Sequence, residues 1–191
     1  MDKSLPVVYN TINYSEVSDH MFSFVPQRIY NSLCDLTPAV LQSENISVLL
    51  MDFDNTIVPY TCDVPAKNVI DWLESVKTAG IRLCVVSNTK KGRAPRFCQT
   101  HGIDCITHAK KPFQKGIKEA LKRYGNTPGK IALVGDQIFT DVLGANCGGI
   151  LSVLVTPIHL HNIWLKLRHY LELPMIYLGK RRLRRGKENE T

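Results

Sequence analysis

The chain has 191 residues, enough for one domain with a substantial core, and its 44% hydrophobic content with 12 glycines and 10 prolines excludes a disordered or collagen-like chain. No stretch approaches the roughly 18–20 uncharged apolar residues of a membrane-spanning helix. The formal net charge of +7 is uneven, because residues 77–130 hold 13 Lys and Arg against 2 Asp and Glu. Such a basic segment can attract an anionic substrate, or it can be a solvated helix face.

In chain order, residues 1–45 predict an N-terminal arm that packs on the core, with Pro38 opening a short helix. Apolar, β-branched segments then alternate with helical patterns, and this alternation predicts a three-layer, Rossmann-like α/β fold with a parallel sheet and helices on both faces. Glycines stand where helices should end, at Gly80, Gly102, Gly125 and Gly148. The predicted strands are Val48–Phe53, Arg82–Ser87, Asp104–Thr107, Lys130–Gly135 and Ile150–Val155, and the predicted helices are Ala66–Ala79, Phe113–Tyr124 and Ile138–Ala145.

The C-terminal part of the chain combines an apolar helical pattern with a basic end. Residues 158–178 place Ile163, Trp164, Leu167, Tyr170 and Leu171 at helical spacing. We expect Ile163, Trp164, Leu167 and Leu171 to cover the sheet; the alternative is an amphipathic helix with Trp164 and Tyr170 on an anionic bilayer. Six of the eight residues at 180–187 are cationic. We predict a main domain over 46–178 and a basic, flexible tail over 179–191, which solubilises the protein, contacts a membrane or contacts nucleic acid.

Two aspartates, Asp52 and Asp54, end the first predicted strand. Carboxylates at the carboxyl end of a strand face the crevice where open α/β sheets bind ligands. Two like charges so close together are costly unless a cation or a proton separates them. The pair therefore predicts a metal-assisted site in which one carboxylate attacks and the other handles a proton.

Polar residues also follow the later strands. Ser87 and Asn88 end the second strand, Lys111 comes after the third, and Asp136 ends the fourth with Asp141 five residues beyond. Each signal alone is common in turns and caps, but the carboxyl ends of parallel strands share one edge, so we expect these residues to converge.

At these residues the sequence resembles the haloacid dehalogenase superfamily of phosphohydrolases, over roughly residues 46–157. The D-x-D-x-T motif matches at Asp52, Asp54 and Thr56. The resemblance implies that Asp52 is the nucleophile that becomes an aspartyl phosphate. It also implies that Asp54 protonates the leaving oxygen and then activates the hydrolytic water.

The same resemblance implies how the substrate and the metal are held. Ser87, Asn88 and Thr56 would contact the substrate, and Lys111 would neutralise the phosphoryl group and the nucleophile. We assign this role to Lys111 and not to Lys110, because the residue directly before Pro112 matches the motif. The implied Mg²⁺ ligands are Asp52, Asp136 and the backbone carbonyl of Asp54, with Asp141 supporting the site.

Short intervals between the motifs narrow the substrate class. Asp52 and Ser87 are separated by 34 residues, and Ser87 and Lys111 by 23, which leaves no room for a mobile cap domain. An open site suits a phosphate on a large or surface-bound substrate better than a small metabolite. The stretches Asp52–Tyr60, Ser87–Thr89, Ala109–Pro112 and Gly135–Asp141 also resemble the capless, subclass III YqeG and phosphatidylglycerophosphate phosphatase group, which implies hydrolysis of phosphatidylglycerophosphate to phosphatidylglycerol in phospholipid biosynthesis.

The expected protein is a magnesium-dependent phosphomonoester hydrolase acting on an anionic phospholipid head group. We expect it in the cytoplasm, peripheral at the inner face of the membrane, since the N-terminus has no apolar core of signal-peptide length. The alternatives are a phosphatase of soluble nucleotide or sugar phosphates and a non-catalytic RNA- or ribosome-binding module. The complete set of catalytic residue types favours an enzyme, so nucleic acid is not the expected partner.

Overall fold

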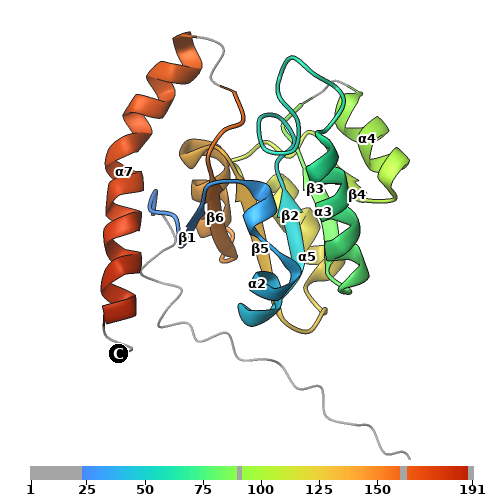
Figure 1. Ribbon diagram of the computed structural model, residues 1–191, viewed down its shortest axis with the longest axis horizontal. Coiled ribbons are helices and arrows are strands. Elements are labelled where there is room, and N and C mark those ends of the chain that lie inside the picture. Colours follow the sequence, from blue (N-terminus) through green and yellow to red (C-terminus); the bar gives the residue numbers. More distant parts are fainter. Residues whose placement is uncertain (1–22, 90–91, 160–162, 189–191) are drawn as a thin grey trace, which may run out of the picture.

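A computed structural model describes residues 23–89, 92–159 and 163–188, and for residues 163–166, 168–169 and 186–188 it describes the backbone alone. Six parallel strands form one sheet in the order β1-β6-β5-β2-β3-β4, with helices packed around it (Figure 1). The strands are β1 Arg28–Tyr30, β2 Ile46–Met51, β3 Arg82–Val86, β4 Asp104–Ile106, β5 Lys130–Gly135 and β6 Leu151–Val155. The helices are η1 Leu33–Asp35, α2 Pro38–Ser43, α3 Lys67–Thr78, α4 Arg93–His101, α5 Lys115–Tyr124, η2 Ile138–Val142, α6 Leu143–Cys147 and α7 Ile163–Glu188.

The central strand β2 is buried on both faces, as its continuous apolar run predicts. Leu49 and Met51 contribute to a core shared with α2, α3 and α4, and Val48 and Leu50 contribute to a second core shared with α5 and α6. Alternate residues of a strand point to opposite faces, so each face needs its own layer of helices. The predicted three-layer α/β fold is therefore confirmed, and within the described residues no cap domain is inserted.

The N-terminal arm supplies a sixth strand that the sequence did not reveal. β1 pairs in parallel with β6, where Arg28 lies opposite Val153 and Tyr30 opposite Val155. No local pattern marks β1 as a strand, because its pairing partner lies about 125 positions away in the chain. The short helix opened by Pro38 is confirmed as α2, whose first turn is capped by the Thr37 hydroxyl accepting from the Val40 amide. Residues 1–22 of the predicted arm lie outside the described residues.

The expectation that α7 covers the sheet through Leu167 and Leu171 is wrong. These side chains are exposed at 50 and 60%, whereas Glu172 is 1% exposed. The inward face of α7 instead places Met175 and Ile176 against a small core formed by Ile29, Ile138, Val142 and Leu154. Fewer apolar side chains of α7 face the core than its composition indicates, because several of them lie on the exposed side of the helix. Ile163 and Trp164, which belonged to the same prediction, have no described side chains.

The boundary predicted at residue 179 lies inside a helix. α7 continues without a break from Ile163 to Glu188, so the basic residues 180–187 extend the same element. The inner side of this continuation is close to the core, because a Cβ on Gly179 would lie 3.1 Å from both Ile29 and Pro26. None of the helices among the described residues is long and apolar enough to cross a membrane.

We expect Gly116→Ala to lower the free energy of unfolding by about 1–3 kcal/mol, the usual cost of overpacking. A Cβ on Gly116 would lie 2.4 Å from the Ala109 Cβ and 2.8 Å from the Ala109 Cα, and backbone cannot yield as a flexible side chain can. Gly92→Ala is the matched control, because a Cβ there would meet nothing within 4 Å. Equal urea-denaturation midpoints for the two variants would contradict this account of the contact between α5 and the segment that precedes Lys111.

Candidate active site

The predicted site residues do converge at the carboxyl edge of the sheet. Asp52 follows β2, Ser87 follows β3 and Asp136 follows β5, and all three are buried. Lys111 reaches the same place from the segment between β4 and α5. β2 has β3 on one side and β5 on the other, so the chain reverses its direction of strand addition at this point, where open α/β sheets bind ligands.

The ammonium group of Lys111 lies between two carboxylates. Its Nζ is 2.6 Å from Oδ1 of Asp52 and 2.7 Å from Oδ1 of Asp141, and both the lysine and Asp141 have side chains only 1% exposed. Burial by itself lowers the pKa of Lys111, but the carboxylates of Asp141 and Asp52 outweigh it and raise that pKa above its usual range. Burial raises the pKa of Asp141 to about 6, against the opposing effect of Lys111.

Three carboxylates form a group that can hold a metal ion. Asp52, Asp136 and Asp141 each offer one oxygen, and these oxygens lie within 4.8 Å of one another in a buried setting. One lysine cannot balance three buried carboxylates, so the donor set fits a divalent cation with a preference for oxygen ligands. Asp141, predicted only to support the metal, is a member of this group. The carboxylate of Asp54, in contrast, lies outside it.

The carboxylate of Asp54 is paired with an arginine that the sequence analysis did not select. Nη1 of Arg93, the first residue of α4, donates to Oδ1 of Asp54 at 2.8 Å. The Asp54 side chain is 17% exposed, so it is more accessible than Asp52 at 8%. A carboxylate at the solvent-facing side of the site can reach a leaving group and a water molecule. Arg93 gave no signal in the sequence, because a single cation in a basic segment has no motif.

Asn88 positions the lysine. Its side-chain Nδ2 donates to the Lys111 carbonyl at 2.9 Å, and its Oδ1 accepts from the Lys111 amide at 2.7 Å. These two hydrogen bonds join the end of β3 to the β4–α5 segment. They engage the side-chain amide of Asn88, which was predicted to contact the substrate. The neighbouring Ser87 hydroxyl accepts from the Thr89 amide at 3.1 Å.

Asn55 fixes the turn that carries the aspartate pair. Its φ of 68° lies in the left-handed region, which asparagine tolerates better than most residues. Its side chain donates to the His159 carbonyl at 2.8 Å and accepts from the His159 amide at 3.0 Å. Next to it, the buried Thr56 hydroxyl has no hydrogen-bond partner within the described part of the chain, and its predicted contact with substrate stays a prediction.

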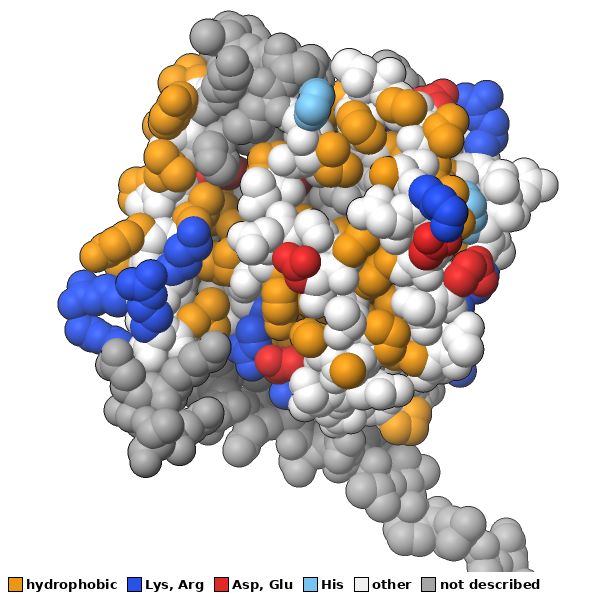
Figure 2. Space-filling view, in the orientation of Figure 1, with side chains coloured by type: hydrophobic (Ala, Val, Ile, Leu, Met, Phe, Trp, Pro, Cys, Tyr) orange, Lys and Arg blue, Asp and Glu red, His pale blue; other side chains and the backbone are white. Residues whose placement is uncertain are grey.

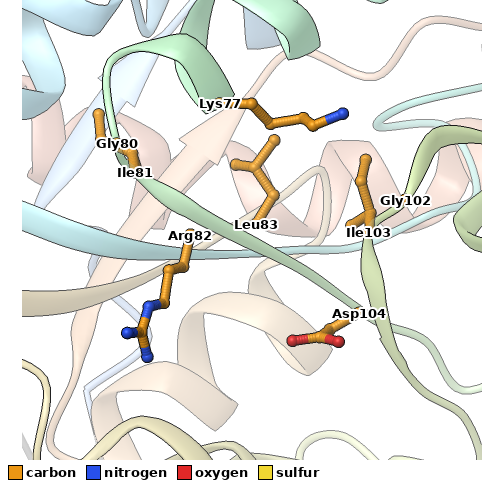
Figure 3. A pocket seen from close by; sticks show the side chains of 8 residues that line it. All are labelled: Lys77, Gly80, Ile81, Arg82, Leu83, Gly102, Ile103 and Asp104. Carbon is orange, nitrogen blue, oxygen red and sulfur yellow. The ribbon is translucent and has the colours of Figure 1, made fainter.

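These residues surround a cavity of about 140 Å³, lined by Asp52, Asp54, Tyr60, Ser87, Asn88, Thr89, Lys111, Gln137 and Thr140. A larger cavity of about 300 Å³ lies at the opposite, amino ends of β3 and β4 (Figure 3). There the ammonium group of Lys77 lies apart from the charged ends of Arg82 and Asp104. A ligand site needs polar groups that converge, so only the smaller cavity has the character of an active site.

Sequence comparisons relate the chain to known phosphatases. Residues 9–158 match the family described as mitochondrial PGP phosphatase. The probable phosphatase YqeG of Bacillus subtilis is 32% identical over 135 residues, which is 71% of this chain and 78% of that protein. The phosphatidylglycerophosphate phosphatase 1, chloroplastic/mitochondrial, of Arabidopsis thaliana is 28% identical over 77% of this chain, which spans only 44% of the length of that relative. Among solved structures, the cobalt-bound deoxy-D-mannose-octulosonate 8-phosphate phosphatase of Haemophilus influenzae is 17% identical with a TM-score of 0.46, over 60% of this chain and 80% of that chain.

We expect Lys111→Met to lower the free energy of unfolding by about 3–5 kcal/mol in the absence of divalent metal, because it leaves buried carboxylates without their cation. Added Mg²⁺ should raise the melting temperature of this variant more than that of the wild type. Lys110→Met is the matched control, since Lys110 is exposed and should lose little stability. Thermal melts in EDTA and in Mg²⁺ test this, and similar melting temperatures for the two variants would contradict it.

Proposed function

The chain belongs to the mitochondrial PGP phosphatase family, within the haloacid dehalogenase-type phosphoric monoester hydrolases, and we propose that it converts phosphatidylglycerophosphate to phosphatidylglycerol with Mg²⁺ as cofactor. The observation that carries the chemistry is the buried Lys111 held against Asp52 at 2.6 Å within the three-carboxylate group. The observation that supports a lipid substrate is the name of the family and of the Arabidopsis relative. The absence of a cap among the described residues suits a substrate held in a membrane.

In the proposed reaction a carboxylate oxygen of Asp52 attacks phosphorus while the bond to the leaving oxygen breaks. Asp54 supplies the proton that this oxygen needs to leave as an alcohol. Asp54 then takes a proton from water, whose oxygen attacks the aspartyl phosphate and releases inorganic phosphate and free Asp52. Lys111 holds the nucleophile in place, and Ser87 and Thr56 are proposed to contact the phosphoryl oxygens.

The group of Asp52, Asp136 and Asp141 would hold the metal. A divalent ion bound there neutralises charge on the phosphoryl group and on the nucleophile. We propose magnesium because it prefers one or two carboxylates together with phosphate and water oxygens. The predicted ligand from the backbone carbonyl of Asp54 is part of the same proposal.

We expect Asp52→Asn to lower turnover by about 10⁴-fold or more while leaving the fold intact, because the amide is a poor nucleophile. Phosphate release would be measured with and without Mg²⁺ from phosphatidylglycerophosphate in vesicles, beside glycerol 3-phosphate, nucleotides and sugar phosphates. Turnover on the vesicles only is the expected result. Turnover only on soluble esters would contradict the lipid substrate, and full activity of Asp52→Asn would remove Asp52 as nucleophile.

We further propose that the chain works as a peripheral protein at the cytoplasmic face of an anionic membrane and binds it through the outward face of α7. Apolar side chains are exposed along the first part of this face, and cations follow on the same side (Figure 2). Tyr177 lies seven residues after Tyr170, and Arg184 follows seven residues later, so the three project in nearly the same direction. Leu171, Leu178 and Arg185 repeat the spacing.

The charge of α7 selects an anionic bilayer as the partner. Glu172 is the only acidic residue between positions 163 and 187, and it faces inward, where its Oε1 accepts from the Ile138 amide at 3.0 Å. The outward face therefore presents apolar side chains and cations without an acidic side chain among them. Helices of this composition lie in the membrane interface, and each Lys or Arg near an anionic surface contributes about 1 kcal/mol.

Arg181→Gln with Arg184→Gln should weaken binding to vesicles that contain phosphatidylglycerol by about 30-fold, the equivalent of about 2 kcal/mol. Lys118→Gln with Lys122→Gln is the matched control, since it removes two exposed cations from α5 and leaves α7 unchanged. Vesicle cosedimentation gives the affinities. Equal losses for both pairs would show that only net charge matters, and unchanged vesicle binding with a changed oligomeric state would make α7 a protein contact instead.

A further inference from the structure

Arg93 donates to the Asp54 carboxylate, and the other N–H groups of its guanidinium donate to neighbouring groups of the same protein. Besides donating to Asp54, Nη1 donates to the Tyr60 carbonyl at 3.3 Å and Nη2 donates to the Pro59 carbonyl at 3.1 Å. The Cys62 carbonyl accepts from Nη2 and the Asp63 carboxylate accepts from Nε. An arginine has five N–H groups, and these contacts use all five.

The guanidinium also packs against an aromatic ring. Its carbon lies 5.6 Å from the centre of the Phe53 ring, a distance at which a cation is attracted to an aromatic face. Phe53 is fully buried and its ring packs against Phe97 of α4 at 5.5 Å. The arginine is therefore fixed by its own helix, by the aromatic core and by the segment 59–63, and its side chain is 14% exposed.

We propose that Arg93 is a positioning residue that sets the orientation of Asp54 toward the leaving oxygen. With its five donors engaged, Arg93 has none to offer a substrate phosphate, and a guanidinium does not release a proton near neutral pH. Its effect on the reaction must therefore pass through Asp54 and through the 59–63 segment, from which Tyr60 lines the same cavity as Asp54. This inference rests on the acid and base role proposed for Asp54.

An acid held in place matters most when the leaving oxygen is strongly basic. The alkoxide that leaves an alkyl phosphate needs a proton, whereas p-nitrophenolate leaves well without one. The ratio kcat/KM reports the steps up to cleavage of the first P–O bond, in which Asp54 is the proposed acid. Loss of Arg93 should therefore lower kcat/KM selectively for alkyl phosphates, and a general loosening of the fold would lower it for both substrates.

The experiment compares kcat/KM for phosphatidylglycerophosphate in vesicles and for p-nitrophenyl phosphate in Arg93→Gln, Arg93→Lys and Asp54→Asn. We expect Arg93→Gln to lose about 10²-fold on the alkyl phosphate and less than about 5-fold on the aryl phosphate, with Asp54→Asn showing the same selectivity. Arg93→Lys keeps the charge but not the planar fork, so it should resemble Arg93→Gln and provides a second variant if that one unfolds. Arg96→Gln, an exposed arginine of the same helix, should behave as wild type.

Equal losses on both substrates would overturn the inference. A double variant adds an independent test, because Arg93→Gln should cost little more once Asp54 is already asparagine, and additive losses would also overturn it. If the wild type acts only on soluble alkyl phosphates, one of these replaces the lipid in the same comparison. In that case the proposed substrate fails while the positioning role of Arg93 is still tested.

Discussion

The ammonium group of Lys111 lies between the carboxylates of Asp52 and Asp141, and the geometry of the site depends on this buried contact. It ties together three segments that are far apart in the chain, because the residue after β2, the β4–α5 segment and η2 each contribute one of the charges. Removing one partner from such a group lowers stability, because it leaves a buried charge without its counter-charge. In the intact group the lysine offsets part of the negative charge of the carboxylates. The surroundings are shaped to permit it: a Cβ on Gly135 would lie 2.2 Å from Oδ2 of Asp141, so only glycine leaves room for that carboxylate.

The aspartate pair after β2 is resolved into two separate charge environments. Asp52 faces the buried lysine and the other carboxylates, and Asp54 faces Arg93 nearer to solvent. The repulsion between these two neighbouring carboxylates is therefore offset by two cations from different parts of the chain, Lys111 for Asp52 and Arg93 for Asp54. Pairs of titratable groups in different environments are suited to different tasks, which supports the proposed division between a nucleophile and an acid.

The site and α7 are connected through η2. This five-residue π-helical turn carries Asp141, and its first amide, that of Ile138, donates to the buried carboxylate of Glu172. The inward side of α7 thereby supports the segment that contains one of the three grouped carboxylates, while its outward side has the composition of a membrane-binding helix. α7 thus connects the proposed active site with the proposed membrane-binding surface.

Local signals in the sequence determined the α/β fold, the strands β2 to β6 and the residues at their carboxyl ends. These features depend on periodicity and on short motifs, and parallel strands bring their ends to one edge whatever the rest of the chain does. Only the tertiary structure decided the partners: β1 on β6, Asn88 on the Lys111 backbone and Arg93 on Asp54. It also decided which side of α7 faces inward. Contacts between residues 23 to 125 positions apart leave no local pattern, because each depends on how whole elements pack and not on the residues next to them.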